Sequence, residues 1–554
     1  MSENTRHTYI QIHPGDNVLV ALQDLPAGTL INFGRLQFTL AENIAAKHKF
    51  TLTELQPGAP VHMYGVLVGK ASAPIVQGGA VTVNNIVHAA SDFKMGSRKT
   101  DWHKPDVSAF ENRTFMGYHR ADGSVGTANY WLVIPLVFCE NRNINVMKEA
   151  LSAKLGFTKP RGYETEVDSL INMYQTGKSV EELLQADLEL SPENEAAHRL
   201  FKNIDGIKFV NHDMGCGGTK TDSDALCGLL AGYITHPNVA GATVLSLGCQ
   251  HAQASILQAE IRKRDAAFNK PLVVLEQQQL GTETVMLHEA LKRTFVGLIE
   301  ANKQERKPAP LSKLCIGLEC GGSDGFSGIS ANPTLGYLSD MLVSMGGSVI
   351  LAEFPELCGV EQELSDRCID EATASRFMKL MTTYNARAEA DGSGFYANPS
   401  PGNIKDGLIT DAIKSAGAAK KGGTSPIAAV LDYPEKVTRP GLNLLCTPGS
   451  DIESTTAEVA AGANIVLFTT GLGTPTGNPV APVVKISTNT KLYQKMPDII
   501  DINCGTIIEG EETIPEAASR MLDYVIELAS GNIKTKAQKL GQDDFIPWKR
   551  GVSL

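Results

Sequence analysis

The sequence has no long apolar run, no cluster of basic residues and few cysteines, and each absence argues against a class of protein. No window approaches the roughly 18 uncharged apolar residues that span a bilayer, and residues 1–24 lack a basic segment followed by an apolar one. We therefore expect a cytoplasmic protein without a membrane partner. Lys and Arg number 50 against 61 Asp and Glu, a net charge of −11, so nucleic acid is not an expected partner.

The cysteines and the common enzyme motifs give further exclusions. Ten cysteines without paired spacing, several inside apolar runs, are typical of reduced thiols and not of a disulfide framework. Gly471, Gly473 and Gly477 do not have the spacing of a dinucleotide fingerprint, and residues 215–220 lack the gap of a phosphate loop. The sequence has no G-x-S-x-G or H-E-x-x-H motif, which argues against the common serine hydrolases and metalloproteases.

The chain does have enough apolar sequence for large cores. Hydrophobic residues make up 42% and charged residues 20% of the 554 residues. At roughly 150 residues per domain, this length predicts about three folding units. Residues 1–95 contain short β-like pieces, such as 17–22 and 61–68, between Pro/Gly turns. They predict a small β domain, followed by a linker over 96–112.

The remainder of the chain alternates short apolar runs with helix-length segments. Near-continuous apolar strands separated by helices indicate parallel sheets that are buried on both faces. We therefore predict an α/β body, whose ligands bind beyond the carboxyl ends of its strands. The predicted strands are 131–139, 208–216, 242–249, 271–276, 314–320, 348–354, 427–433, 442–448, 464–471 and 480–488.

Four cysteines lie at the ends of such runs: Cys139, Cys216, Cys249 and Cys320. If they converge, their thiolates can hold iron or an iron–sulfur cluster with one iron open to substrate, and the alternative is that each is a small buried residue. His212 and His251 lie close to two of them in sequence. Each can act as a base or metal ligand, or can be a hydrogen-bonded structural histidine.

Glycine-rich polar loops follow several strands. Within 318–336, glycines occur together with Ser323, Asp324, Ser327 and Asn332, and such a loop can bind a polyhydroxylated anion. Segments 396–403 and 469–477 have the same chemistry, with hydroxyls, carboxamides and glycines and little charge. A tight connection without a ligand is the alternative.

Several of these segments resemble the altronate/galactarate dehydratase family, in particular its altronate branch, and the resemblance covers essentially the whole chain. It implies a β-clip (SAF) domain over 1–95, a linker over 96–112, a second α/β domain over 113–310 that can form a dimer interface, and a Rossmann-like catalytic domain over 311–554. The matching segments are "CGGSDGFSGISANPTLG", "NPSPGN", "TTGLGTP", "ADGSVGTANYW" and "SLGC".

The resemblance also implies an activity and a cofactor. Members remove water from sugar acids, usually with Fe(II) or Mn(II), and give 2-keto-3-deoxy acids. We expect a base to take the proton beside the carboxylate and the metal to stabilise the resulting enediolate. The catalytic residues expected are His212, as the base, and Asp324. The substrate-binding residues expected are Ser323, Ser327, Asn332, Asn398, Ser400, Asn403, Thr470 and Thr474. The metal ligands expected are Cys139, Cys216, Cys249 and Cys320.

The sequence departs from the family pattern at a few positions. Leu472 and Thr476 replace an arginine and a tyrosine of the family's "TTGRGTPYG". Because arginine is the natural bidentate partner of a carboxylate, its absence means that another residue binds that group or that the substrate differs. Thr82 and Asn84 occupy the place of an H-x-H pair, although His88 lies close by.

Our leading hypothesis is a hydro-lyase that converts D-altronate to 2-keto-3-deoxy-D-gluconate as a homodimer. A close rival keeps the reaction and changes the substrate to galactarate or another aldonate. Two further classes are a non-catalytic protein that binds sugar acids and a thiol-based iron or redox protein.

Overall fold

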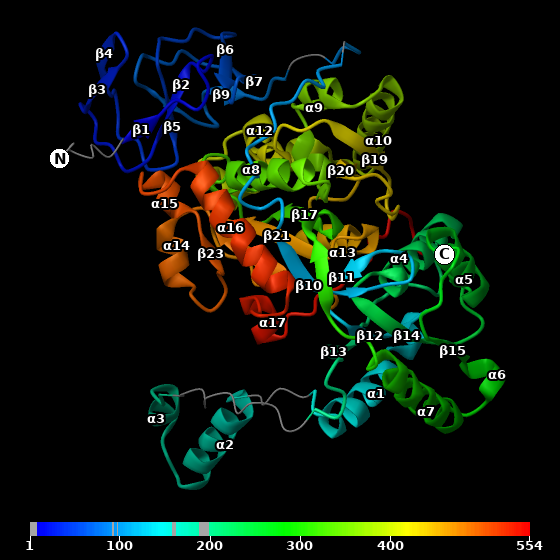
Figure 1. Cartoon of the computed structure of the whole chain (residues 1–554). Helices are drawn as coiled ribbons and strands as arrows, with labels where there is room; N and C mark the ends of the chain where they lie inside the picture. Colours follow the sequence, from blue (N-terminus) through cyan, green and yellow to red (C-terminus); the bar gives the residue numbers. More distant parts are fainter. Residues whose placement is uncertain (1–7, 91–92, 97, 158–161, 188–198) are drawn as a thin grey trace.

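The computed structural model places short antiparallel strands at the N-terminus and parallel sheets in the rest of the chain (Figure 1). It describes residues 8–90, 93–96, 98–157, 162–187 and 199–554. This mixed α/β architecture confirms the predicted fold class. No helix within these ranges combines the length and the apolar character that a membrane span requires.

The N-terminal domain groups its strands into a four-stranded sheet, β1-β2-β5-β8, a hairpin, β3-β4, and a three-stranded sheet, β6-β7-β9. Leu19, Ile31 and Phe50 form part of its buried core. The strands are β1 (Tyr9–Ile10), β2 (Val18–Ala21), β3 (Leu30–Phe33), β4 (Leu36–Thr39), β5 (Lys49–Thr51), β6 (Pro60–Met63), β7 (Val66–Ala71), β8 (Ala80–Val81) and β9 (Ile86–Val87).

The run 61–68, predicted as one β piece, is a hairpin, and that prediction is wrong. Strands β6 and β7 pair antiparallel, and the chain reverses between them at Tyr64 and Gly65. These two residues have φ values of 60° and 79°, the left-handed conformation that a two-residue hairpin turn needs at both central positions. The sequence hid the turn because tyrosine rarely adopts this conformation.

The predicted linker packs along the C-terminal domain. Its described residues, 96 and 98–112, contain no helix or strand. Val107 and Phe110 nevertheless lie in the main hydrophobic core, and the Trp102 indole N–H donates a hydrogen bond of 3.1 Å to the Thr424 hydroxyl. The linker is therefore held against the C-terminal domain.

The second domain has a parallel four-stranded sheet in the order β13-β12-β14-β15. The chain enters and leaves it through a small antiparallel sheet of β11, β10 and β16. The strands are β10 (Thr114–His119), β11 (Val125–Gly126), β12 (Tyr130–Pro135), β13 (Gly206–Phe209), β14 (Val239–Ser246), β15 (Leu272–Glu276) and β16 (Lys307–Pro310). The helices are α1 (Asn141–Lys154), α2 (Gly162–Gln175), α3 (Val180–Leu184), α4 (Lys220–Thr235), α5 (Ala254–Arg264), α6 (Gln277–Leu280) and α7 (Glu283–Ala301).

The C-terminal domain is built on a parallel seven-stranded sheet in the order β19-β20-β18-β17-β21-β22-β23. The strands are β17 (Cys315–Cys320), β18 (Ser348–Leu351), β19 (Ile427–Leu431), β20 (Gly441–Leu445), β21 (Ile465–Thr470), β22 (Val483–Ser487) and β23 (Ile502–Asn503). The helices are α8 (Ala331–Ser344), α9 (Glu361–Arg367), α10 (Glu371–Ala390), α11 (Pro401–Lys405), α12 (Asp411–Ala419), α13 (Asp451–Ala461), α14 (Thr490–Lys495), α15 (Gly505–Ile508), α16 (Ile514–Ala529) and α17 (Lys536–Leu540).

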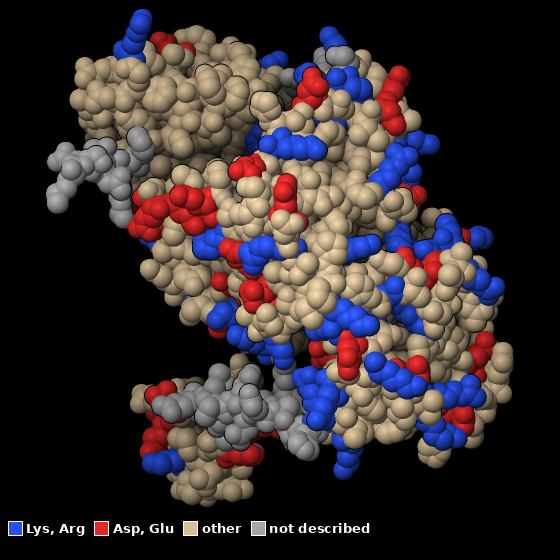
Figure 2. Space-filling view, in the orientation of Figure 1, with Lys and Arg blue, Asp and Glu red and all other residues tan. Residues whose placement is uncertain are grey.

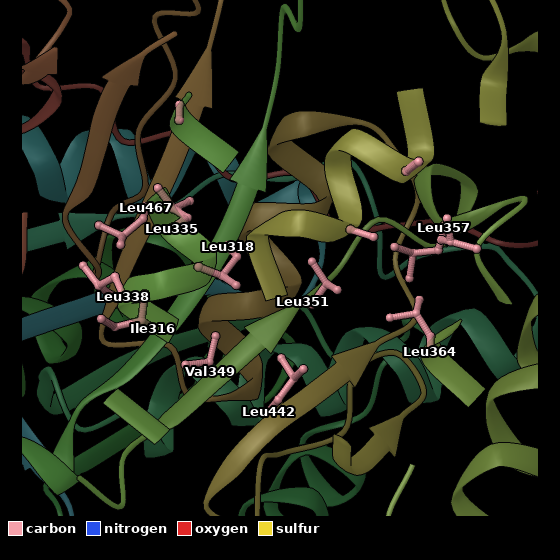
Figure 3. Close-up of a cluster of buried hydrophobic side chains, with 14 of the residues drawn as sticks. Ile316, Leu318, Leu335, Leu338, Val349, Leu351, Leu357, Leu364, Leu442 and Leu467 are labelled. Atoms are coloured by element: carbon pink, nitrogen blue, oxygen red, sulfur yellow. The ribbon is translucent and has the colours of Figure 1, made fainter. Parts of the chain in front are cut away.

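Alternate residues of β21 belong to two different cores, one on each face of this sheet. Leu467 packs in a core that includes Leu335 and Leu338 of α8 and the neighbouring Leu318 of β17 (Figure 3). Phe468 packs in a second core that includes residues of α13 and of α4. Helix α4 of the second domain therefore helps to cover the sheet of the C-terminal domain.

The order of the strands creates a switch point between β17 and β21. From β17 the chain continues to β18 on one side, and it returns later to β21 on the other. In open parallel sheets, ligands bind beyond the carboxyl ends of the strands at such a point. The residues that follow β17 and β21 are therefore the first place to look for a site.

Charged side chains are spread over the body of the molecule. On the face shown in Figure 2, Lys and Arg alternate with Asp and Glu over the second and C-terminal domains. The N-terminal domain shows few charged side chains on this face. The described part of this surface thus has no continuous basic patch.

Helix α7 offers a matched test of the core. Leu298 is fully buried there, whereas Val296 is 65% exposed. We expect Leu298→Ala to lower the free energy of unfolding by about 2–5 kcal/mol, because it removes buried contacts and leaves a cavity. Val296→Ala should change it by less than about 0.5 kcal/mol. Thermal unfolding of both variants checks this, and equal midpoints would contradict the packing described.

Candidate functional site at the carboxyl edge of the C-terminal sheet

The loops after β17 and β21 bind each other directly at the switch point. The backbone N–H groups of Gly471 and Leu472 both donate to the Gly322 carbonyl, each at 3.0 Å. Gly322 has a φ of 59°, and a Cβ there would lie 3.2 Å from the Thr470 hydroxyl and 3.3 Å from the Thr474 hydroxyl. The structure thus brings the two predicted threonines to the glycine-rich loop.

Asp324 is fully buried below this loop and accepts several hydrogen bonds. Its Oδ1 accepts from the hydroxyls of Ser327, at 3.1 Å, and Thr488, at 2.9 Å. Its Oδ2 lies 3.1 Å from the Lys47 ammonium. Asp324 and Ser327 therefore lie together as predicted, and their contacts fix the loop and a cation.

That cation comes from the N-terminal domain, and sequence analysis did not identify it. Lys47 has a φ of 76°, and its Nζ also lies 2.9 Å from Asp406. A Cβ on either Gly325 or Gly407 would lie 2.5 Å from the Lys47 carbonyl, so only glycines allow this close approach. The N-terminal domain thus contributes a side chain to the site over a long sequence separation.

Four more predicted residues form a neighbouring polar group. The Asn403 amide donates to the Ser323 carbonyl at 2.8 Å, and the Ser400 hydroxyl donates to Asn403 Oδ1 at 2.9 Å. Ser400 and Asn403 also form the capping box of α11. Lys414 donates to Asn398 Oδ1 at 2.7 Å, which joins Asn398 to the same group.

Asn332 is buried and holds elements together. Its amide donates to the Gly417 carbonyl at 3.0 Å, and its Oδ1 accepts from the Thr469 hydroxyl at 2.7 Å. The side chain therefore joins α8, α12 and the end of β21. Its contact with a substrate stays a prediction.

A buried group of charges lies where β17 and β18 end. The Lys421 ammonium lies 2.9 Å from Cys320 Sγ and 2.5 Å from Glu353 Oε2. Cys320 Sγ is also 3.1 Å from Glu356 Oε2, and Glu356 is 2.6 Å from Lys414. Both lysines and both glutamates were missed at the sequence level, because nothing in their spacing marks them.

The electrostatics of this group follow from its burial. Burial and the neighbouring Glu353 carboxylate raise the pKa of the Cys320 thiol well above its usual value. Burial would also raise the pKa of Glu356, but the ammonium groups of Lys414 and Lys421 hold it below the usual value. Cys320 is therefore a thiol beside an ionised carboxylate.

The arrangement argues against a metal ion on Cys320. The ligand atoms of Cys320, Glu353 and Glu356 lie within 4.8 Å of one another, as a metal site requires. However, the Lys421 ammonium lies against two of them and already supplies the positive charge. A second group of this kind among the described residues is His88, Cys358 and Asp411.

Asp451, the first residue of α13, faces the loop after β17. A Cβ on Gly321 would lie only 2.1 Å from its Oδ2, so the loop approaches Asp451 through a glycine. Burial, together with the carboxylates of Glu353 and Glu356, raises the pKa of Asp451 to about 7. Sequence analysis missed it because an acidic residue at a helix N-terminus is common.

His212 lies in the second domain with both ring nitrogens engaged. Its Nε2 is 2.8 Å from the Pro135 carbonyl, and its Nδ1 accepts from the Met214 backbone N–H at 3.1 Å. Burial lowers the pKa of the ring below its usual value. Its role as the base stays a prediction, and in this arrangement neither nitrogen is free to take a proton.

The four predicted metal cysteines do not share one place. Cys139, Cys216 and Cys249 are exposed at the carboxyl edge of the second domain's sheet. Cys320 is buried among Glu353, Glu356 and Lys421. Cys320 thus ends a strand of a different sheet from the other three, and the role of all four as metal ligands stays a prediction.

Family models match almost the whole chain. One described as "D-galactarate/Altronate dehydratase, C-terminal" matches residues 311–553. Another, "D-galactarate dehydratase/Altronate hydrolase, second domain", matches residues 117–302. A third, "Altronate/galactarate dehydratase SAF domain", matches residues 7–89.

Individual proteins match over the same length. The altronate dehydratase of Escherichia coli K12 is 33% identical over 546 residues, 99% of this chain and 100% of that protein. The altronate dehydratase of Bacillus subtilis 168 is 32% identical over 551 residues, again 99% of this chain and 100% of that protein. The galactarate dehydratase (L-threo-forming) of E. coli K12 is 30% identical over 540 residues, 96% of this chain and 95% of that protein. The chain therefore belongs to the altronate/galactarate dehydratase family, with an N-terminal SAF domain, and is a carbon–oxygen lyase.

Proposed function

We propose that this chain is a cytoplasmic hydro-lyase that converts D-altronate to 2-keto-3-deoxy-D-gluconate in the breakdown of hexuronates. Similarity to two altronate dehydratases over their full length supports this substrate. The observation that carries the proposal is the polar group at the switch point. Hydroxyls and carboxamides gather there around two ammonium groups, Lys47 and Lys414, and a polyhydroxylated anion needs such partners.

The proposed reaction needs a group that accepts the weakly acidic proton beside the carboxylate. Asp451 suits this task better than His212, because a carboxylate with a pKa of about 7 is half ionised near neutral pH. Asp451 also lies against the loop after β17, in which the predicted substrate-binding residues lie. Asp324 positions Lys47 and the glycine-rich loop.

A divalent ion, Fe(II) or Mn(II), remains part of the proposal. When bound, such an ion polarises the substrate carboxylate and stabilises the enediolate. His88, Cys358 and Asp411 would hold it, because their nitrogen, sulfur and oxygen ligand atoms lie within 4.8 Å of one another. Asp411 begins α12, and Lys414 follows one turn later.

Galactarate or another aldonate is the alternative substrate. Similarity to a galactarate dehydratase at 30% identity favours it, whereas Leu472, which is exposed beside the site, does not. An aliphatic side chain cannot bind a carboxylate. A substrate with two carboxylates therefore needs another positively charged residue to bind the second one. A non-catalytic protein that binds sugar acids is the alternative of another class.

We also propose that the chain is a homodimer through its second domain. Helices α2 and α3 lie away from the body in Figure 1. Tyr163, Val167 and Tyr174 are largely exposed on α2, at a spacing that places them on one helix face. A second copy of the chain would bury this face.

A panel of sugar acids tests the reaction and its substrate. Protein purified without oxygen and supplied with Fe(II) or Mn(II) should release a 2-keto-3-deoxy acid from D-altronate. Lys47→Met should lower kcat/KM at least tenfold, because it leaves Asp324 and Asp406 without their shared cation. Product from galactarate or another aldonate instead would reassign the substrate. No product from folded protein with any acid would support the binding protein.

The pH dependence tests Asp451. Because the proposed acceptor must be ionised, kcat/KM should rise with pH and level off above about 7. Asp451→Asn should lower kcat/KM by about 10²- to 10⁴-fold. A raised pKa in the folded state means that ionisation of Asp451 destabilises the fold as pH rises through about 7. At pH 8 the melting temperature of Asp451→Asn should therefore be no lower than that of the wild type. Full activity of Asp451→Asn would rule out this role.

Light scattering of the full chain tests the dimer. We expect the mass of two chains for the wild type and of one for Tyr174→Glu, because a charge on this face opposes its burial. Tyr396→Glu is the control, since Tyr396 is similarly exposed on the C-terminal domain. A monomeric wild type, or a dimer that persists in Tyr174→Glu, would exclude this interface.

A further inference from the structure

Three cysteines at the carboxyl edge of the second domain have no part in the site described above. Cys139 follows β12, Cys216 follows β13 and Cys249 follows β14, and these strands are neighbours in the order β13-β12-β14. All three are free and exposed. Neighbouring parallel strands thus present one thiol each at the same edge.

The three loops that carry these cysteines are joined through their backbones. The Phe138 N–H donates to the Met214 carbonyl at 3.0 Å, which joins the first loop to the second. The His251 N–H donates to the Cys216 carbonyl at 3.3 Å, and the Ala252 N–H donates to the Gly215 carbonyl at 3.2 Å, which joins the second to the third. The thiols are therefore held on one fixed frame.

A glycine with positive φ precedes two of the three cysteines. Gly215 has a φ of 101° and Gly248 a φ of 127°. A Cβ on Gly215 would lie 2.3 Å from the Leu136 carbonyl, and one on Gly248 would lie 2.6 Å from Gln278 Oε1. Two loops of otherwise different sequence thus each have a glycine with a positive φ directly before the cysteine. In both loops this glycine lets the chain pass close to an adjacent segment.

The thiols also affect one another. Burial raises the pKa of the Cys139 thiol, and the charges of Cys216 and Cys249 raise it further. The three thiols therefore lie near enough to one another to interact.

The spacing of the thiols distinguishes between two kinds of centre. A single tetrahedral ion with bonds of about 2.3 Å holds its sulfur ligands roughly 4 Å apart. Among the described side chains, groups of three ligands within 4.8 Å of one another include His88, Cys358 and Asp411 and the Cys320 group, but not these three cysteines. An iron–sulfur cluster fits wider spacing, because each thiolate binds a different iron.

We propose that Cys139, Cys216 and Cys249 bind an iron–sulfur cluster of the four-iron type. Three cysteines leave one iron of such a cluster without a protein thiolate, and that iron is open to an oxygen ligand. The cluster is distinct from the divalent ion on His88, Cys358 and Asp411. Its presence does not depend on which acid the enzyme dehydrates.

The cluster lies on the same side of the molecule as the candidate site. Helix α4 packs beside α13, where a Cβ on Gly232 would lie 2.5 Å from the Ala460 carbonyl. Near the start of these helices, burial raises the pKa of Glu453, and the Asp213 carboxylate adds to this shift. The loop of Cys216 and the N-terminus of α13, with Asp451, thus lie close together.

Reconstitution of the full chain tests the cluster without any sugar acid. Protein prepared without oxygen is incubated with Fe(II) and sulfide, desalted, and assayed for iron, acid-labile sulfide and visible absorption. We expect about four sulfides per chain, and about four irons in addition to any ion held by His88, Cys358 and Asp411. Cys139→Ser, Cys216→Ser and Cys249→Ser should each lose at least half of the sulfide and of the absorption.

Cys358→Ser is the matched control, because it removes a half-buried thiol of the other ligand group and should leave the sulfide content unchanged. Thermal unfolding without iron checks that the three serine variants fold, which is expected since these side chains are exposed. Iron bound without sulfide would overturn the cluster in favour of a single ion. Wild-type protein that takes up neither, or serine variants that keep the full content, would also overturn it.

Discussion

The C-terminal domain depends on the balance of charge in its interior. Lys421 and Lys414 are the ammonium groups that lie among the buried Cys320, Glu353 and Glu356. Removing one partner from such a group costs several kcal/mol, because it leaves the others buried without compensation. Since Cys320 ends β17 and Glu353 follows β18, these ion pairs also fix the central strands at their carboxyl ends. The loops of the site start from there.

The strands of the body could be predicted from sequence because of how they are buried. A parallel strand covered on both faces has apolar residues at every position, so runs such as 464–471 and 480–488 stand out, and they contain β21 and β22. The N-terminal hairpin was misread for the opposite reason. Its turn uses Tyr64 in a conformation that side chains rarely adopt, and nothing in the local sequence signals it.

The site was predictable where it follows strand ends and unpredictable where it depends on distant contacts. Ser323, Thr470 and Asn403 lie in glycine-rich or proline-rich segments after strands or before helices, so local sequence identifies them. Lys47 and Lys421 contact partners hundreds or tens of residues away, and only the folded chain places them. For His212, sequence showed a titratable ring but not the two backbone groups that occupy its nitrogens.

The docking of the N-terminal domain has a consequence for the order in which the molecule is assembled. Lys49 is buried, and its ammonium donates to the Gly407 carbonyl, 358 residues later in the chain. During synthesis the N-terminal domain emerges long before that acceptor exists, so Lys49 remains hydrated and charged at first. Burial lowers its pKa from 10.5 to about 7, so docking releases protons at pH values between these two. Maturation of the enzyme is thereby coupled to proton concentration.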